Sequence, residues 1–125
     1  MGNTGPLRDR TILLLEYDPA VALEIEEALT GAGAKTVLAR DLEEGMNLSE
    51  QAELSAAILD FKLHDGDSLA LSQRLEERCI PYVVYSHFTE LQLQYDPNNY
   101  LSKPATAGTL IAKVCGMLSI VHPHK

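Results

Sequence analysis

The sequence predicts a single α/β domain built on a parallel sheet. Short apolar runs of strand length alternate along the chain with stretches whose apolar residues recur at helical spacing. At 125 residues the chain is long enough to bury a hydrophobic core without disulfides or a structural metal. No repeat, linker or low-complexity tract divides it. Five strands alternating with five helices therefore predict a parallel sheet covered by helices on both faces.

The first strand and helix have distinct sequence signals. Residues 11–15 form a continuous apolar run that ends at the polar residues Glu16 and Asp18, which predicts a fully buried strand. Pro19 directly follows Asp18, a pair typical of a helix with an aspartate cap and a proline in its first turn. The apolar residues that follow keep helical spacing until Gly31, where the helix is expected to end.

The remaining elements repeat this alternation. Four further short apolar runs predict strands, and the stretches between them predict helices. Asp41 and Glu44 are spaced as in a capping box, which marks the start of the second helix. The expected strands are 35–39, 56–59, 81–85 and 100–102, and the expected helices are about 41–52, a segment containing Leu71 and Leu75, His87 to about Tyr95, and Lys103–Pro104 to about Ile120.

Composition excludes several function classes. The chain has 10 Lys and Arg against 18 Asp and Glu, a formal net charge of -8, which argues against nucleic acid or an anionic membrane surface as a partner. No apolar run approaches the length of about 18 residues that spans a bilayer. Cys79 and Cys115 have no metal-site spacing, so a reduced, cytoplasmic protein is expected. Residues 1–10 are expected to be a polar leader, 11–121 the domain and 122–125 a tail.

Polar side chains of interest follow the first, third, fourth and fifth predicted strands. Glu16 and Asp18 follow the first strand, Asp60 the third, Ser86 the fourth and Lys103 the fifth. Ligands of open parallel sheets bind at the carboxyl ends of the strands. Carboxylates brought together there repel each other unless a cation lies among them, so the set is a candidate functional site. Each residue taken alone could equally be a helix cap or part of a solvated turn.

In this order, these residues resemble the signature of receiver domains of bacterial two-component response regulators. That signature is an acidic group with a proline after the first strand, an Asp after the third, a Ser or Thr after the fourth and Lys-Pro after the fifth. The resemblance covers residues 11 to about 119. It implies a flavodoxin-like, three-layer α/β/α sandwich whose five parallel strands have the order 2-1-3-4-5.

The resemblance also implies a role for each side chain. Asp60 would accept a phosphoryl group from a histidine kinase or a histidine phosphotransfer protein, which gives an acyl phosphate. Lys103 would pair with Asp60 and then with the phosphoryl oxygens, and Ser86 would hydrogen-bond the phosphate. Tyr100 would be the aromatic switch residue. The face formed by the fourth helix, the fifth strand and the last helix would contact a downstream protein or a second copy of the chain.

The metal site is where the sequence departs from the family. Receivers usually carry two consecutive acids after the first strand, and Tyr17 stands at the second position. The remaining Mg²⁺ ligands would be Glu16, Asp60 and the backbone carbonyl of Lys62, with Asp18 as a further candidate if it does not cap the helix. A phenol is a poor ligand for Mg²⁺, so weak binding or none is expected. The Lys62 ammonium could also lie near Asp60 and replace part of the missing charge.

Two further positions have open interpretations. His87 follows Ser86 where receivers usually carry a small residue, so its ring could narrow the entrance to the site, donate a hydrogen bond to phosphate, or simply lie on the surface. Lys113 is the only charged residue between 105 and 121, and apolar residues cover a wide arc of that predicted helix. We expect part of this apolar face to be exposed as an interface, the alternative being a deeply packed helix.

These observations lead to two functional hypotheses. The first is a single-domain receiver that is phosphorylated on Asp60, signals through protein contacts and is not an enzyme with turnover. The second is a degenerate receiver that acts as a phosphorylation-independent adaptor or dimerisation module because Tyr17 replaces a metal-binding acid. A small hydrolase is the least supported, because the sequence has no nucleophile elbow, Gly-rich phosphate loop or obvious general base.

Overall fold

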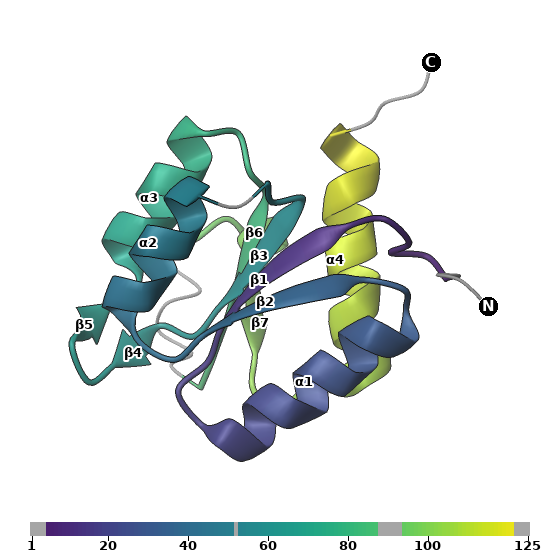
Figure 1. The fold of residues 1–125 in the computed structure, drawn as a ribbon, viewed down its shortest axis with the longest axis horizontal. Coiled ribbons are helices and arrows are strands. Elements are labelled where there is room, and N and C mark those ends of the chain that lie inside the picture. Colours follow the sequence, from purple (N-terminus) through teal and green to yellow (C-terminus); the bar gives the residue numbers. More distant parts are fainter. Residues whose placement is uncertain (1–4, 52, 88–93, 122–125) are drawn as a thin grey trace.

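A five-stranded parallel sheet lies at the centre of the molecule (Figure 1). The computed structural model describes residues 5–51, 53–87 and 94–121. The strands are β1 (Thr11–Leu15), β2 (Lys35–Ala39), β3 (Ala56–Leu59), β6 (Tyr82–Ser86) and β7 (Tyr100–Ser102), in the spatial order β2-β1-β3-β6-β7. Numbered along the chain, the five parallel strands have the order 2-1-3-4-5, so the predicted flavodoxin-like fold class is confirmed.

Helices cover both faces of this sheet. Helices α1 (Pro19–Gly31) and α4 (Ala107–Val121) lie on one face, and α2 (Leu42–Gln51) and α3 (Leu69–Glu77) lie on the other (Figure 1). Successive side chains of a strand point to opposite faces. Ile12 and Leu14 of β1 therefore pack with α1 and α4, whereas Leu13 and Leu15 pack with α2 and α3. The helix predicted from His87 to about Tyr95 lies largely outside the described residues.

The strand register brings the ends of the central strands together. Leu15 at the end of β1 pairs with Ala39 of β2 and with Leu59 of β3, and each of these residues is the last of its strand. Beyond that point, Asp60 N–H donates to the Leu15 carbonyl at 2.8 Å and Glu16 N–H donates to the Ala39 carbonyl at 3.1 Å. The acidic residues after β1 and β3 therefore lie at one edge of the sheet.

The predicted starts of the first two helices are confirmed. The Asp18 carboxylate accepts a hydrogen bond from Ala20 N–H at 2.9 Å, at the amino end of α1. At α2, the Asp41 carboxylate accepts from Glu44 N–H at 2.9 Å. The Glu44 carboxylate in turn accepts from Arg40 N–H at 2.9 Å, one residue earlier than in a standard capping box.

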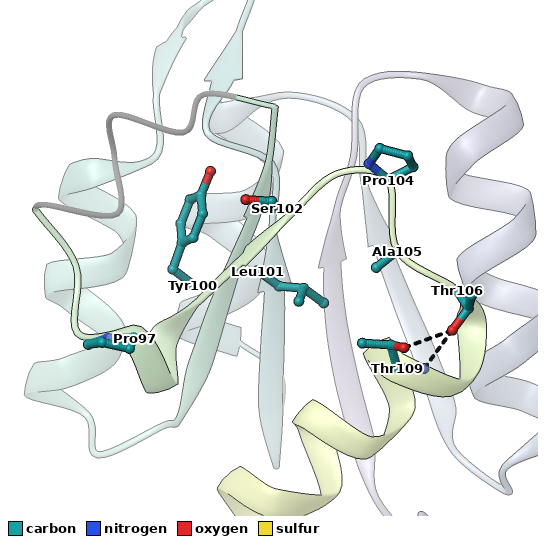
Figure 2. Close-up of a pocket in the computed structure, with 8 residues that line it drawn as sticks. All are labelled: Pro97, Tyr100, Leu101, Ser102, Pro104, Ala105, Thr106 and Thr109. Atoms are coloured by element: carbon teal, nitrogen blue, oxygen red, sulfur yellow. Dashed lines mark hydrogen bonds between the residues drawn. The ribbon is translucent and has the colours of Figure 1, made fainter.

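The last helix begins later than predicted. The sequence predicts a start at Lys103–Pro104, but α4 begins at Ala107. Thr106 is the residue that precedes the helix, and its hydroxyl accepts a hydrogen bond from Thr109 N–H at 3.0 Å (Figure 2). Such a side-chain bond satisfies a free N–H at a helix start, and it places the first turn of α4 after Thr106.

The expectation that α4 exposes part of its large apolar face is wrong for the side chains that the structure describes. The large apolar residues are buried or partly buried because they pack against α1 and the sheet. They are Leu110, Ile111, Val114, Met117 and Leu118. The exposed positions carry small or hydroxyl side chains instead, at Gly108, Thr109, Ala112, Gly116 and Ser119. The alternative interpretation, a deeply packed helix, fits these residues.

A small hairpin after Asp60 is absent from the sequence-based prediction. Strands β4 (Lys62–Leu63) and β5 (Gly66–Asp67) pair antiparallel within the expected loop. At the tip of this hairpin, the Asp65 carboxylate accepts hydrogen bonds from Leu42 N–H at 3.0 Å and from Glu43 N–H at 3.1 Å. The hairpin is thereby attached to the amino end of α2.

In the described part of the chain, no helix has the length and apolar character needed to cross a membrane.

Candidate functional site

Three charged side chains meet at the carboxyl edge of the sheet. The Lys103 ammonium lies 3.0 Å and 3.2 Å from the two carboxylate oxygens of Glu16. The same ammonium lies 3.6 Å from a carboxylate oxygen of Asp60. The sequence-based prediction that acids after β1 and β3 converge with a lysine after β7 therefore agrees with the geometry. We call Glu16, Asp60 and Lys103 the acidic pocket.

The members of the acidic pocket differ in their access to solvent. The side chain of Glu16 is 2% exposed and that of Lys103 is 7% exposed, whereas that of Asp60 is 15% exposed. Glu16 also accepts a hydrogen bond from Asp18 N–H at 3.2 Å. Glu16 is thus enclosed between Lys103 and the backbone, and Asp60 is the carboxylate of the pocket that a reactant outside the protein can reach.

Burial changes the protonation of Glu16. Removal of this carboxylate from water raises its pKa to about 7, and the negative charge of Asp60 acts in the same direction. The hydrogen bond and the charge of Lys103 oppose both effects without cancelling them. The single positive charge of Lys103 therefore does not fully offset the desolvation and mutual repulsion of two carboxylates in this pocket.

Tyr85 holds Lys103 in place, a contact that the sequence analysis did not identify. The Lys103 ammonium lies 5.4 Å from the centre of the Tyr85 ring, within the range of a cation–π contact. The Tyr85 hydroxyl accepts a hydrogen bond from Ala105 N–H at 2.9 Å. Tyr85 is 5% exposed. A tyrosine in an otherwise buried apolar strand was the available signal, because a buried hydroxyl needs a hydrogen-bond partner.

The residues expected to bind phosphate and to switch lie next to the acidic pocket. Ser86 is the last residue of β6, and its carbonyl accepts a hydrogen bond from Lys103 N–H at 2.8 Å. The same carbonyl accepts from the Tyr100 hydroxyl at 3.2 Å. Ser86 is 1% exposed and Tyr100 is 6% exposed. The backbone of Ser86 therefore links the expected phosphate-binding lysine to the expected switch aromatic.

Four predicted site residues stay outside the acidic pocket. Tyr17 is 57% exposed, and its ring centre lies 6.4 Å from that of His64. Asp18 is exposed and caps α1. Lys62 is exposed on β4, and no ion pair joins its ammonium to Asp60, which is also a described residue. The role of the Lys62 backbone carbonyl as a metal ligand stays a prediction. His87 is exposed directly after β6.

The side chains of the pocket do not form a ligand set for Mg²⁺ as they stand. Mg²⁺ requires near-octahedral oxygen ligands. Both oxygens of Glu16 contact the Lys103 ammonium, and Tyr17 brings a phenol in place of a carboxylate. Within the described ranges, the one group of three His, Cys, Asp or Glu side chains whose ligand atoms lie within 4.8 Å of one another is Asp41, His64 and Asp65. That group contains neither Glu16 nor Asp60.

A separate pocket lies along β7. Its volume is about 710 Å³, and it is lined by Pro97, which belongs to the short helix η2 (Pro97–Asn99), and by residues between 100 and 109. Figure 2 shows Tyr100 and Leu101 directed to different sides of β7, with Thr106 and Thr109 hydrogen-bonded at the start of α4. All of the lining residues are uncharged. A ligand or partner in this pocket would therefore contact only uncharged side chains, along the edge strand of the sheet.

Comparison with known proteins finds regulatory relatives. No family model matches the chain. The photosynthetic apparatus regulatory protein RegA of Rhodobacter capsulatus is 27% identical over 109 residues, which are 82% of this chain and 59% of that protein. The KDP operon transcriptional regulatory protein KdpE of Escherichia coli K12 is 28% identical over 109 residues, 82% of this chain and 48% of that protein. The chain spans about half the length of the curated relatives it matches.

Solved structures with the same arrangement include two receiver domains. The receiver domain of the Francisella response regulator 1452 has a TM-score of 0.79 at 22% identity, over 90% of this chain and 99% of that chain. The receiver domain of the sensor histidine kinase PA1611 of Pseudomonas aeruginosa PAO1 has a TM-score of 0.78 at 23% identity, over 88% and 98%. The PA1611 structure contains a magnesium ion coordinated in its active-site cleft.

Proposed function

We propose that this chain, which has the fold of a response-regulator receiver domain, accepts a phosphoryl group on Asp60 and signals through protein contacts. The observation that carries the proposal is the position of Asp60, a partly exposed carboxylate 3.6 Å from the Lys103 ammonium at the carboxyl edge of the sheet. The names of RegA and KdpE as regulatory proteins support a signalling role. The free cysteines Cys79 and Cys115 are consistent with a location in the cytoplasm.

The proposed reaction needs a nucleophile, a phosphodonor and a nearby positive charge. An Asp60 oxygen attacks the phosphorus of a phosphohistidine on a histidine kinase or a histidine phosphotransfer protein. A P–O bond to Asp60 forms, the P–N bond breaks, and its electron pair stays on the histidine nitrogen. Lys103 lies where its ammonium can stabilise negative charge on the phosphoryl oxygens. The product is an acyl phosphate, and the chain acts as an acceptor rather than as an enzyme with turnover.

The proposed output surface is the face around β7 and α4. The Ser86 carbonyl binds both Lys103 N–H and the Tyr100 hydroxyl, so a shift of Ser86 toward a phosphoryl group would also move Tyr100. Tyr100 lines the uncharged pocket along β7. Residues 100–125 contain no acid and three lysines, in contrast to the rest of this acidic chain. An acidic surface of a downstream protein, or of a second copy of the chain, would meet less charge repulsion there than elsewhere.

A specific observation also favours the second candidate, a phosphorylation-independent adaptor. Both Glu16 oxygens contact Lys103, at 3.0 Å and 3.2 Å, which are shorter distances than the 3.6 Å from Lys103 to Asp60. Tyr17 is exposed where receivers usually carry a second acid. If the Lys103 ammonium remains bound to Glu16, it stabilises less of the negative charge on a phosphoryl group that is transferred to Asp60.

Phosphorylation by a small donor distinguishes the two candidates. The chain is incubated with acetyl phosphate or phosphoramidate, with and without MgCl₂, and its intact mass is measured. We expect the mass of one added phosphoryl group in the unmodified chain and none in Asp60→Asn. Asp9→Asn is the matched control, because it removes one exposed carboxylate near the start of β1.

The mass measurement gives a different result for each of the two candidate functions. An adduct that persists in Asp60→Asn would show that another residue is modified and would refute the assignment of Asp60. Absence of an adduct under every condition would favour the adaptor. Amide NMR shifts of Ser86 and Tyr100 on addition of beryllofluoride, a mimic of the phosphoryl group, would report whether the output side of the pocket responds.

A further inference from the structure

The Lys103 ammonium contacts two kinds of group, carboxylates and an aromatic ring. It lies 3.0 Å and 3.2 Å from the two Glu16 oxygens and 3.6 Å from an Asp60 oxygen. It also lies 5.4 Å from the centre of the Tyr85 ring. Because lysine carries its charge at the end of a flexible four-carbon stem, the groups around the ammonium decide where that charge is placed. The Tyr85 ring is therefore one of the groups that determine its position.

The Tyr85 side chain is itself fixed at both ends. Its backbone belongs to β6 and pairs with Leu101 of β7. At the other end, its hydroxyl accepts a hydrogen bond from Ala105 N–H at 2.9 Å and donates one to the Ala105 carbonyl at 3.4 Å. An aromatic side chain has only two rotatable bonds, so these anchors leave the ring little freedom. Tyr85 therefore presents a rigid ring to a flexible lysine.

The strand order explains why this ring matters for Asp60. In the sheet, β6 lies between β7, which Lys103 follows, and β3, which Asp60 follows. Glu16 follows β1, which lies one strand further away. The contacts of the ammonium with Glu16 are the shorter ones, so attraction by Glu16 alone would draw the charge past Asp60. The Tyr85 ring attracts the cation back toward β6, and such an attraction is stronger in a site with little water.

We propose that Tyr85 is a positioning residue: its ring keeps the Lys103 ammonium beside Asp60, where that charge can act on an incoming phosphoryl group. The inference rests on the proposed function, because it names a residue that prepares the same pocket for it. Tyr85 touches no reacting atom and acts only through Lys103. It also gives a reason for the tyrosine. On the same face of β6, Val83 fills the core without a polar group, whereas the buried Tyr85 hydroxyl needs its bonds to Ala105.

The side-chain NMR resonances of Lys103 test the position without any phosphodonor. An aromatic ring shifts the resonances of protons that lie over its face, so the methylene protons next to the Lys103 ammonium report whether they stay there. We expect an upfield shift in the unmodified chain and in Tyr85→Phe, which keeps the ring. In Tyr85→Leu the shift should be lost. A purely structural role of Tyr85 would leave these protons where they are in every folded variant.

The rate of phosphorylation by acetyl phosphate tests the consequence. Tyr85→Leu is expected to react about fivefold more slowly than the unmodified chain, and Tyr85→Phe within about twofold of it, because only the leucine variant loses the cation–π contact. Tyr82→Leu is the matched control. Tyr82 is also a buried tyrosine of β6, but it packs on the opposite face of the sheet, where its hydroxyl bonds to Glu76 at 2.6 Å. This control should stay within about twofold of the unmodified chain, as expected for an independent site.

Each outcome supports or overturns the inference. A Tyr85→Leu variant that reacts at the rate of the unmodified chain would overturn it, as would an equal loss in Tyr82→Leu, which would indicate general destabilisation. If the unmodified chain takes no phosphoryl group, the proposed function fails, but the Lys103 resonances still decide whether Tyr85 positions the ammonium. If Tyr85→Leu does not fold, nuclear Overhauser contacts between the Tyr85 ring and the Lys103 methylene protons in the unmodified chain decide: their presence supports the inference and their absence overturns it.

Discussion

Replacement of Glu16 by glutamine should remove a pH dependence of stability. Burial raises the pKa of Glu16 to about 7 from an ordinary value of 4.5. Because the folded chain holds this proton more tightly than the unfolded chain does, the folded state binds more protons between pH 4.5 and pH 7. The free energy of unfolding should therefore fall as the pH rises through this window.

The size of the effect follows from the same two values. The gap between 4.5 and about 7 corresponds to about 3 kcal/mol of stability, which is present below pH 4.5 and lost above pH 7. Glutamine has nearly the shape of protonated glutamate and does not ionise. Glu16→Gln should therefore match the parent chain at pH 4.5 and exceed its stability by up to about 3 kcal/mol at pH 8.

Urea unfolding followed by circular dichroism measures this difference. Both chains are unfolded at several pH values between 4.5 and 8, with a chelator present, and the difference in unfolding free energy is plotted against pH. Glu24→Gln is the matched control because Glu24 is exposed on α1, where a substitution is expected to change stability by about 0.5 kcal/mol or less. Parallel curves for Glu16→Gln and the parent chain would refute the reasoning.

Three further substitutions have defined outcomes. Tyr85→Phe removes the hydroxyl that accepts from Ala105 N–H and should cost about 1–3 kcal/mol, and an unchanged urea midpoint would contradict this. Leu14→Ala, at a fully buried position between the sheet and the α1–α4 layer, should cost about 2–5 kcal/mol in the same assay. Tyr17→Asp should raise Mg²⁺ affinity in calorimetric titration, because it restores the carboxylate that the phenol replaces. An affinity equal to that of the parent chain would show that Tyr17 is not at the position of the missing acid.

Local sequence patterns were sufficient for most of the fold. Apolar runs predicted the strands because a strand covered on both faces has few polar positions. Asp18 and Asp41 were found because helix caps bond to residues two or three positions away. The start of α4 was wrong because Lys103–Pro104 also has the appearance of a helix start. The hydroxyl that caps the helix belongs to Thr106, three residues after Lys103.

The site was predictable in position but not in its contacts. Strand ends brought Glu16, Asp60 and Lys103 together because parallel strands share one carboxyl edge. The order of residues in the sequence does not reveal which lysine pairs with which acid. Lys62 was a candidate because it follows Asp60 by two residues, but it is exposed on β4. Tyr85 lies on β6 and contacts Lys103, which directly follows the neighbouring strand β7. Contacts of this kind depend on distances between side chains of different elements, and the spacing of apolar residues along the sequence does not predict those distances.

The hydrogen bonds of Asp65 have a consequence for how the molecule opens. Through Asp65, the hairpin that follows Asp60 is tied to the amides of Leu42 and Glu43 in the first turn of α2. A hydrogen-bonded amide exchanges with solvent only when its bond breaks. Deuterium uptake at Leu42 and Glu43 is therefore a reporter, on a different element, of whether the hairpin that follows Asp60 stays bound to the start of α2.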